Sequence, residues 1–132
     1  MSQENVAVVH RALNALADLD HGQATAHFAP DAEWHNTSAF PGPRVCVGTD
    51  AILDFWKALN EGFSERGEEI EQVWETGDFV VIGVHQWGSG RASDVPFDVR
   101  FAAIFEVVDQ RIVRVDIYGA YAKALEAAGL RE

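Results

Sequence analysis

The fold class follows from residues 97–118, which read FDVRFAAIFEVVDQRIVRVDIY. Asp109 and Gln110 divide this stretch into two alternating runs, and a short polar break between such runs predicts a β-hairpin. The odd positions of the first run are apolar, whereas its even positions include Asp98 and Arg100. Burying those charges without partners would be costly, so we expect the odd residues to face the core. By the same reasoning, the residues of the second strand that face the core are Val113, Val115 and Ile117.

Two further strands are expected before this hairpin. Phe79–Trp87 is rich in β-branched and aromatic residues, but apolar side chains fall on both of its faces, so its inner face stays open. Glu69–Glu75 is charged and predicts an exposed strand. Apolar residues on both faces, with Ile104 and Tyr118 turned outward, indicate that the outer face of the sheet is covered too. A homodimer packed through that face is the simplest cover.

Helical spacing marks the N-terminal half of the chain. Apolar residues recur at steps of three and four from Val6 to Leu16, and a short helix is expected from Gly22 to about Phe28. A third helix, capped by Thr49 or Asp50, has the strongest apolar stripe, formed by Ile52, Phe55, Trp56, Leu59 and Phe63.

The remaining segments complete the prediction. Residues 32–36 alternate weakly, with Trp34 and Asn36 on one face, and residues 37–48 are expected to form a long loop. A short C-terminal helix is expected over Ala120–Ala128. Helices separated from a run of hairpin-linked strands indicate an α+β fold, here an antiparallel sheet packed on three N-terminal helices. We expect one domain over residues 1–132.

The amino-acid composition limits the classes of binding partner and the location of the protein. Twenty-one acidic residues against ten basic ones leave a net charge of -11, which argues against nucleic acid and against peripheral membrane binding. The absence of a long apolar run and of a basic N-terminal start predicts a cytoplasmic protein. Cys46 is the only cysteine, and the five histidines show no close pairing, so we expect no metal site and no cofactor.

Five segments, in order, resemble a SnoaL-like domain of the nuclear transport factor 2-like superfamily, whose other members include ketosteroid isomerase and limonene epoxide hydrolase. They are the opening helix with His21-Gly22, FAPDAEWH at 28–35, VGTDAI at 47–52, TGDFVV at 76–81 and RIVRVDIY at 111–118. The resemblance implies a cone, in which a strongly curved sheet wraps around an apolar pocket and helices close one side. It also implies a dimer. It does not imply one reaction, because the fold hosts isomerases, cyclases, hydrolases and binding proteins.

The chemistries of these relatives do not transfer residue by residue. The three groups of ketosteroid isomerase, a base and two oxyanion donors, fall here on Asn36, Ala12 and Ala103. In the pattern of limonene epoxide hydrolase, Asn36 matches a water-holding Asn, but the Arg and Asp residues fall on Val84, Gln86 and Ile117. SnoaL-type cyclases use an acidic residue in the pocket, and the sequence places none on the inner face.

Two residues are candidates for catalysis. Asn36 could donate to a ligand oxygen or position a water, and it could equally be a loop-entry residue bonded to nearby backbone. His35 could act as a base if the register of its strand is shifted by one residue, although strand alternation favours a solvent-facing or partner-facing histidine.

The expected pocket is largely apolar, with Asn36 and Gln86 as its few polar contacts. Its predicted lining is Ala12, Leu16, Trp34, Phe55, Leu59, Val84, Gln86, Phe101, Ala103, Val115 and Ile117. Such a lining suits a small, mostly apolar molecule with one or two oxygens, such as a polyketide, terpenoid or steroid-like compound.

Three functions remain open. The first is a cofactor-independent isomerase, cyclase or hydrolase, the second is a binding protein without catalysis, and the third is a dimerisation module whose cone is filled by its own side chains. An ionisable group inside the cone would favour the enzyme. A large dry pocket without such a group would favour the binding protein.

Overall fold

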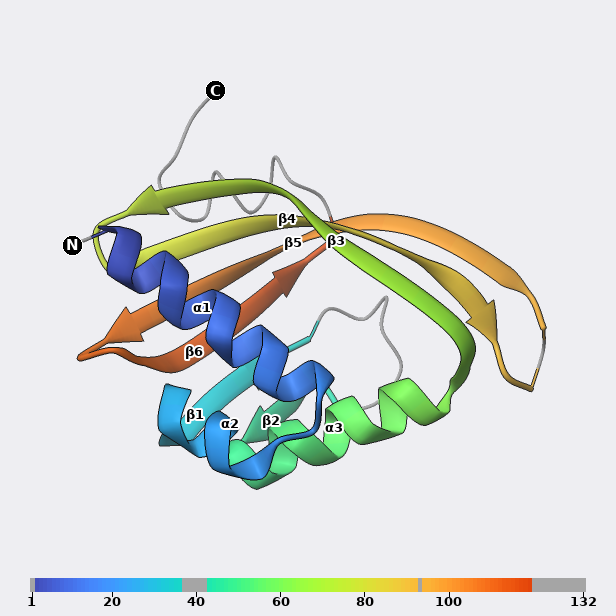
Figure 1. Cartoon of the computed structure of the whole chain (residues 1–132), viewed down its shortest axis with the longest axis horizontal. Helices are drawn as coiled ribbons and strands as arrows, with labels where there is room; N and C mark the ends of the chain where they lie inside the picture. Colours follow the sequence, from blue (N-terminus) through green and yellow to red (C-terminus); the bar gives the residue numbers. More distant parts are fainter. Residues whose placement is uncertain (1, 37–42, 93, 120–132) are drawn as a thin grey trace.

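A computed structural model describes residues 2–36, 43–92 and 94–119 (Figure 1). The expected C-terminal helix therefore lies outside the described residues, as do residues 37–42 of the expected loop. The elements are α1 (Ser2–Ala17), α2 (His21–His27), β1 (Phe28–His35), β2 (Val45–Val47), α3 (Thr49–Glu61), β3 (Phe63–Thr76), β4 (Phe79–Gly90), β5 (Pro96–Val108) and β6 (Arg111–Tyr118). Within the described residues, no helix is long and apolar enough to cross a membrane.

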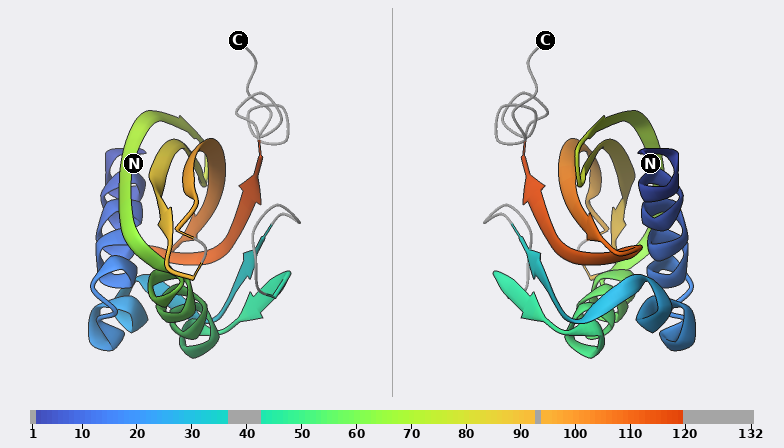
Figure 2. Two further views of the ribbon diagram at one scale, coloured as in Figure 1. Left: turned by 90° about the vertical axis from the view of Figure 1, so that its right-hand side faces the viewer. Right: turned by 90° about the vertical axis from the view of Figure 1, so that its left-hand side faces the viewer.

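The six strands form one curved, unclosed sheet in the order β2-β1-β6-β5-β4-β3. Three hairpins join β3, β4, β5 and β6 in antiparallel pairs, as expected, but β1 runs parallel to β6. The sheet is therefore mixed, which corrects the antiparallel prediction. Hairpin turns reveal the direction of strands that follow one another, whereas β1 and β6 come from opposite ends of the chain. The expected α+β cone is confirmed (Figure 2).

The helices close the concave side of the sheet. α1 contacts the sheet at β3, β4, β5 and β6, and α3 contacts it at β1, β2 and β3. The main core lies between them, where the largest fully buried side chains include Leu16, Ile52, Phe105 and Ile112. The odd residues of β5 from Phe101 to Val107 belong to this core, as the charge argument predicted, because Ala103, Phe105 and Val107 are buried there and Phe101 packs against them. Val99 has the same parity but is 41% exposed.

Pairing with β5 settles the open face of β4. Val80 pairs with Phe105, Ile82 with Ala103 and Val84 with Phe101, so the even residues of β4 face the concave side. Val81 lies on the opposite face, in a smaller apolar cluster. The members of that cluster are Val81, Ala102 and Ile104, with Trp74 and Tyr118 packed against them.

Several boundaries differ from the prediction. β3 begins at Phe63 rather than Glu69, and β4 continues through Gly90. The two strands approach closely there, because a Cβ on Gly88 would clash with the Glu65 carbonyl oxygen. Gly88 is therefore required by the neighbouring backbone, and Gly67 leaves the space that the Trp87 indole occupies. Glycine in a sequence is more typical of a helix end or a loop.

The other differences lie around β1 and α3. β1 begins at Phe28, which was expected to end the preceding helix, and β2 lies inside the predicted loop. Gly48 is the N-cap of α3 and provides no side-chain cap, so Thr49 is the first helical residue rather than the cap.

Candidate functional site

A cavity of about 500 Å³ lies between the concave face of the sheet, α1 and α3. Its walls are mostly apolar, and its exposed lining residues, among them His10, Asn14 and Glu69, mark an opening between α1 and β3. The lining comprises His10, Leu13, Asn14 and Ala17 of α1, Trp34 of β1 with Asn36 after it, Phe55, Trp56 and Leu59 of α3, Arg66, Glu68, Glu69 and Ile70 of β3, Ile82, Val84 and Gln86 of β4, Phe101, Ala103 and Phe105 of β5, and Ile117 of β6. This size and polarity suit a small-molecule site.

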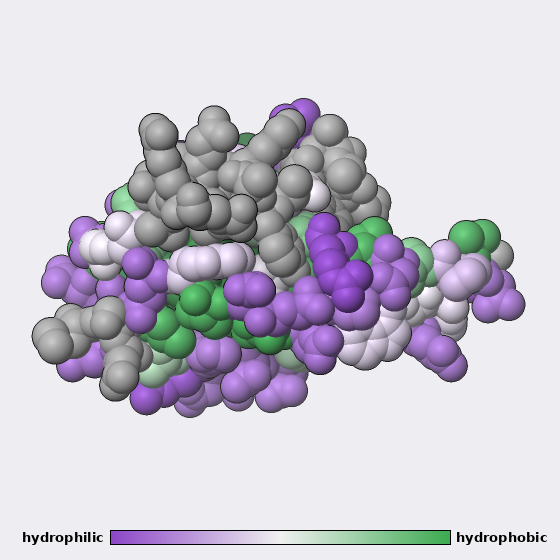
Figure 3. All heavy atoms as spheres, turned by 90° about the horizontal axis from the view of Figure 1, so that it is seen from above, coloured by the Kyte–Doolittle hydropathy of each residue, from purple (hydrophilic) through white to green (hydrophobic). Residues whose placement is uncertain are grey.

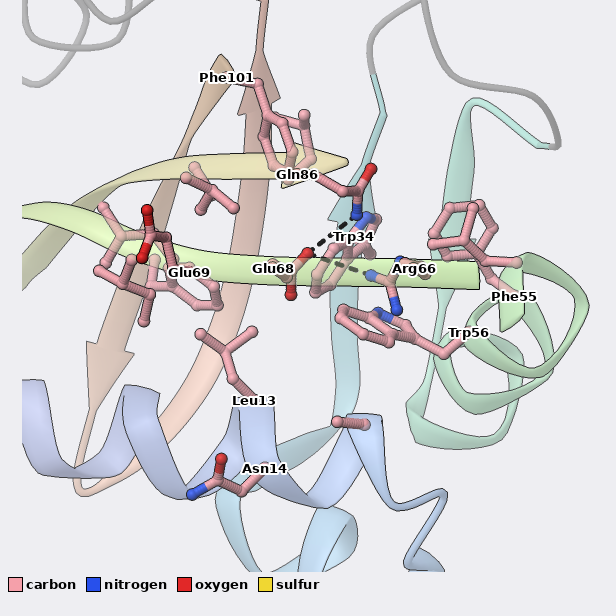
Figure 4. Close-up of a pocket in the computed structure, with 18 of the residues that line it drawn as sticks. Leu13, Asn14, Trp34, Phe55, Trp56, Arg66, Glu68, Glu69, Gln86 and Phe101 are labelled. Carbon is pink, nitrogen blue, oxygen red and sulfur yellow. Dashed lines mark hydrogen bonds and ion pairs between the residues drawn. The ribbon is translucent and has the colours of Figure 1, made fainter. Parts of the chain in front are cut away.

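One part of the cavity wall is polar, and three side chains form it (Figure 4). Arg66 Nη2 donates to Glu68 Oε2 at 3.1 Å, and Gln86 Nε2 donates to the same oxygen at 2.9 Å. Arg66 and Glu68 lie two residues apart on β3, and Glu68 pairs with Gln86 across the sheet, so strand geometry brings all three to the concave face. We call Arg66, Glu68 and Gln86 the polar cluster.

Helix α3 holds the arginine of the polar cluster from the other side. Arg66 Nη1 donates to Asn60 Oδ1 at 2.9 Å, and the guanidinium carbon lies 5.2 Å from the ring centre of Trp56. Such stacking on an indole face is favourable for a guanidinium. Its charge is therefore fixed in place beside Glu68. The second Glu68 oxygen, Oε1, has no hydrogen bond within the described residues.

A SnoaL-like domain matches residues 9–115, which is most of the chain. The chain belongs to the SnoaL-like family. A search of curated proteins gives no match. The fold also occurs in solved structures with low sequence identity to this chain, and three of them are described below.

Each structural relative covers most of this SnoaL-like chain. One is a Catenulispora acidiphila protein with a ketosteroid isomerase-like fold, in complex with trimethylamine. It is 18% identical to this chain with a TM-score of 0.71, and the match covers 94% of this chain and 93% of the other. TerC, co-crystallised with polyporic acid, is 16% identical with a TM-score of 0.74, covering 93% and 96%. A Sinorhizobium meliloti protein, provisionally named a polyketide cyclase, is 27% identical with a TM-score of 0.65, covering 83% and 92%.

Most of the residues predicted to line the pocket of this SnoaL-like protein do line the cavity. They are Trp34, Asn36, Phe55, Leu59, Val84, Gln86, Phe101, Ala103 and Ile117. The other three, Ala12, Leu16 and Val115, are fully buried in the core and are not among the lining residues. Contacts among the helices and β6 cover them, which strand and helix parity alone does not reveal.

The structure separates the two candidate catalytic residues. His35 is not among the lining residues, and its Nε2 lies 2.7 Å from Glu33 Oε1 on the other face of β1. The shifted register that would bring His35 inward is absent. Asn36 lines the cavity, but its Oδ1 accepts from Trp34 Nε1 at 2.9 Å and its Nδ2 donates to the Pro43 carbonyl at 3.0 Å.

Sequence reasoning missed Arg66 and Glu68. The expected strand started at Glu69, and the apolar stripe of the preceding helix was expected to reach Phe63, so Arg66 and Glu68 fell between the two predicted elements. The expectation of no acidic residue on the inner face is therefore wrong, since Glu68 lines the cavity. The signal was present in the alternation of Arg66, Glu68 and Ile70, which places one apolar residue on the same face as the two charges.

One group of possible metal ligands occurs among the described residues. Oxygen or nitrogen atoms of Glu69, Glu71 and His85 lie within 4.8 Å of one another. Ion pairs account for this group, because His85 Nε2 lies 2.9 Å from Asp98 Oδ1 and Arg100 Nε donates to Glu71 at 3.0 Å. We therefore assign no metal to it.

Proposed function

We propose that this SnoaL-like protein binds a small, mostly apolar, oxygen-bearing molecule in the cone and converts it without a cofactor, as an isomerase, cyclase or hydrolase. The polar cluster supports the proposal, because it sets an ionisable carboxylate beside a fixed guanidinium in a mostly apolar cavity. Binding in the cavity desolvates the ligand, so the cluster acts on it more strongly than it would in water.

Glu68 is the proposed proton-transfer group. Its Oε1 takes a proton from a carbon next to a ligand carbonyl, and the electron pair of the broken C–H bond moves to the carbonyl oxygen. The guanidinium of Arg66 stabilises the resulting negative oxygen. If a C=C bond adjoins the carbanion, returning the proton from Glu68 to the far carbon of that bond re-forms the carbonyl and gives an isomer. If the carbanion attacks a second carbonyl, a ring closes and the new alkoxide takes the proton from Glu68. These two routes need no further reactant, whereas hydrolysis consumes one water.

The ligand is proposed to be a polyketide, terpenoid or steroid-like compound. Aromatic walls formed by Trp34, Phe55, Trp56 and Phe105 favour a flat or polycyclic body. The co-crystallisation of TerC with polyporic acid supports a small organic ligand for this fold, because that protein shares the fold.

Filling the cavity tests the binding step. Ala103 is 2% exposed and lines the middle of the cavity from β5. We expect 2-naphthol to bind the wild-type protein and Ala103→Leu to weaken its binding by about tenfold or more, because the added side chain occupies ligand space. Isothermal titration calorimetry measures both affinities, and thermal unfolding verifies that the variant is folded. Equal affinities would contradict binding in the cone.

A second candidate function is ligand binding without catalysis. It is favoured by the hydrogen bonds that Glu68 Oε2 already accepts from Arg66 and Gln86, since a carboxylate held in this way can serve to orient a ligand hydroxyl. The two functions differ in whether Glu68 exchanges a proton with the ligand.

We also propose a homodimer packed through the outer face of the sheet. Trp87 supports it, because it is 40% exposed on the outer face of β4 and its ring centre lies 4.8 Å from that of His85. Val81, Ala102 and Ile104 of the same face are already buried within one chain. Seen from above, apolar residues lie among hydrophilic ones on the described surface (Figure 3). Light scattering should give twice the chain mass of 14.5 kDa, and a mass of one chain at micromolar concentration would contradict the dimer.

A cytoplasmic location and a single domain stay predictions.

A further inference from the structure

A second cavity, of about 530 Å³, lies on the other side of α3, against β2. Val45, Cys46 and Val47 contribute its β2 wall, and Ala51 and Ala58 face it from α3. We call this cavity the α3–β2 groove. Helix α3 thus has a cavity along each of two neighbouring faces.

Two side chains belong to both cavities. Phe55 and Leu59 line the cone and also line the α3–β2 groove. They are four residues apart, so they lie one above the other on a single stripe of the helix. Phe55 is 8% exposed, and its ring is tilted by 44° against Trp34 at 6.3 Å instead of being stacked on it. At this place the side chains of Phe55 and Leu59 lie between the two cavities.

On the strand side, a hydrogen bond connects a residue that lines the cone with one that lines the groove. Asn36 lines the cone and Pro43 lines the groove, and the Asn36 side chain donates to the Pro43 carbonyl at 3.0 Å. This bond holds the start of β2 beside the end of β1. The groove is therefore fixed relative to the cone from both α3 and the sheet.

The groove is suited to hydrocarbon. Val45 and Val47 are 44% and 59% exposed, which leaves apolar surface in contact with water. Cys46 is buried, and burial raises the pKa of its thiol, so this side chain is uncharged at neutral pH. Asp54 is the single charged residue among the described lining residues of the groove, and it is exposed. An apolar chain that covered this surface would gain free energy from burial.

We infer that the α3–β2 groove is a second lobe of the ligand site, which takes an apolar tail of the molecule whose oxygen-bearing head lies at the polar cluster. Phe55 is then the residue that sets how far a ligand extends, because a tail reaches the groove only past its ring. The inference rests on the proposed function and makes it more specific. The ligand class becomes an elongated molecule with an oxygenated ring at one end and hydrocarbon at the other.

Two phenols that differ only in tail length test this inference. We expect 4-octylphenol to bind the wild-type protein at least tenfold more tightly than 4-ethylphenol, since each buried methylene adds about 0.8 kcal/mol. Ala58→Trp places an indole in the groove from an exposed helical position. It should weaken 4-octylphenol binding about tenfold and leave 4-ethylphenol binding unchanged, because only the longer tail reaches the groove.

Matched variants make the result specific. Lys57→Trp adds the same indole one residue earlier, at an exposed position outside both sets of lining residues, and should change neither affinity. Val47→Lys introduces a charge into the groove from β2 and should repeat the selective loss seen with Ala58→Trp. Calorimetry measures all affinities.

The possible results separate this inference from the proposed function. If both phenols bind and neither groove variant weakens 4-octylphenol, the tail leaves the cone elsewhere and the second lobe is wrong, while the proposed function stands. If 4-ethylphenol does not bind the wild-type protein, the cone is no phenol site, and the proposed function and the second lobe are both overturned.

Discussion

Replacing Glu68 by glutamine should slow proton exchange at a bound ketone by about 10²–10⁴-fold, the usual contribution of a positioned acid–base group. The probe is 2-tetralone, whose hydrogens next to the carbonyl exchange with deuterium in D₂O. We expect the wild-type protein to accelerate this exchange over buffer. Glutamine keeps the shape of Glu68 and can still accept from Arg66 and Gln86, but it cannot take a proton. Proton NMR measures the exchange rate.

Two controls separate catalysis from binding in this experiment. Glu65→Gln makes the same change on β3 at an exposed residue outside the cavity lining, and it should leave the exchange rate unchanged. The affinity of Glu68→Gln for 2-tetralone should stay within about threefold of wild type, which is less than the worth of one ordinary hydrogen bond. Binding of 2-tetralone without accelerated exchange in the wild-type protein would favour the binding function over the enzyme.

Replacing Phe105 by alanine should lower the free energy of unfolding by about 3–5 kcal/mol, as for other buried aromatic residues. Phe105 is 0% exposed on β5, and its ring meets that of Trp34 edge-on at 6.3 Å. Removing it both exposes apolar surface and enlarges a cavity that is already present in the cone. Urea unfolding followed by circular dichroism measures the loss.

The matched control for this change lies on the same strand. Val99 has the same parity on β5 but is 41% exposed, so Val99→Ala should cost less than about 1 kcal/mol. A loss below about 1 kcal/mol for Phe105→Ala as well would mean that the ring is not part of the packed core, since burial of this kind is among the largest contributions to stability.

The fold could be predicted where neighbouring elements carry opposite polarity on their two faces. Asp98 and Arg100 fixed the outer face of β5, and the spacing of Ile52, Phe55 and Trp56 fixed a helix face. β4 could not be oriented, because both of its faces are apolar. The parallel pairing of β1 with β6 could not be predicted from the sequence either, since no turn connects those two strands.

The apolar wall of the site was predictable, and its chemistry was not. Trp34, Phe101 and Ala103 were placed correctly because strand parity alone brings them to the concave face. Arg66 and Glu68 were missed because the expected strand started after them, at Glu69, whereas in the structure they lie on β3 and bond to each other within the cone. Gly67 added to the error, since glycine is more often a break than a residue covered by an indole.

A crystal structure of the protein with 2-tetralone bound would show whether the cone holds a ligand with its oxygen at the polar cluster. We expect the ketone oxygen within hydrogen-bond distance of Arg66 and the adjacent carbon beside Glu68 Oε1. Density for the ligand elsewhere on the molecule, or in the cone with its oxygen turned away from Arg66 and Glu68, would contradict it.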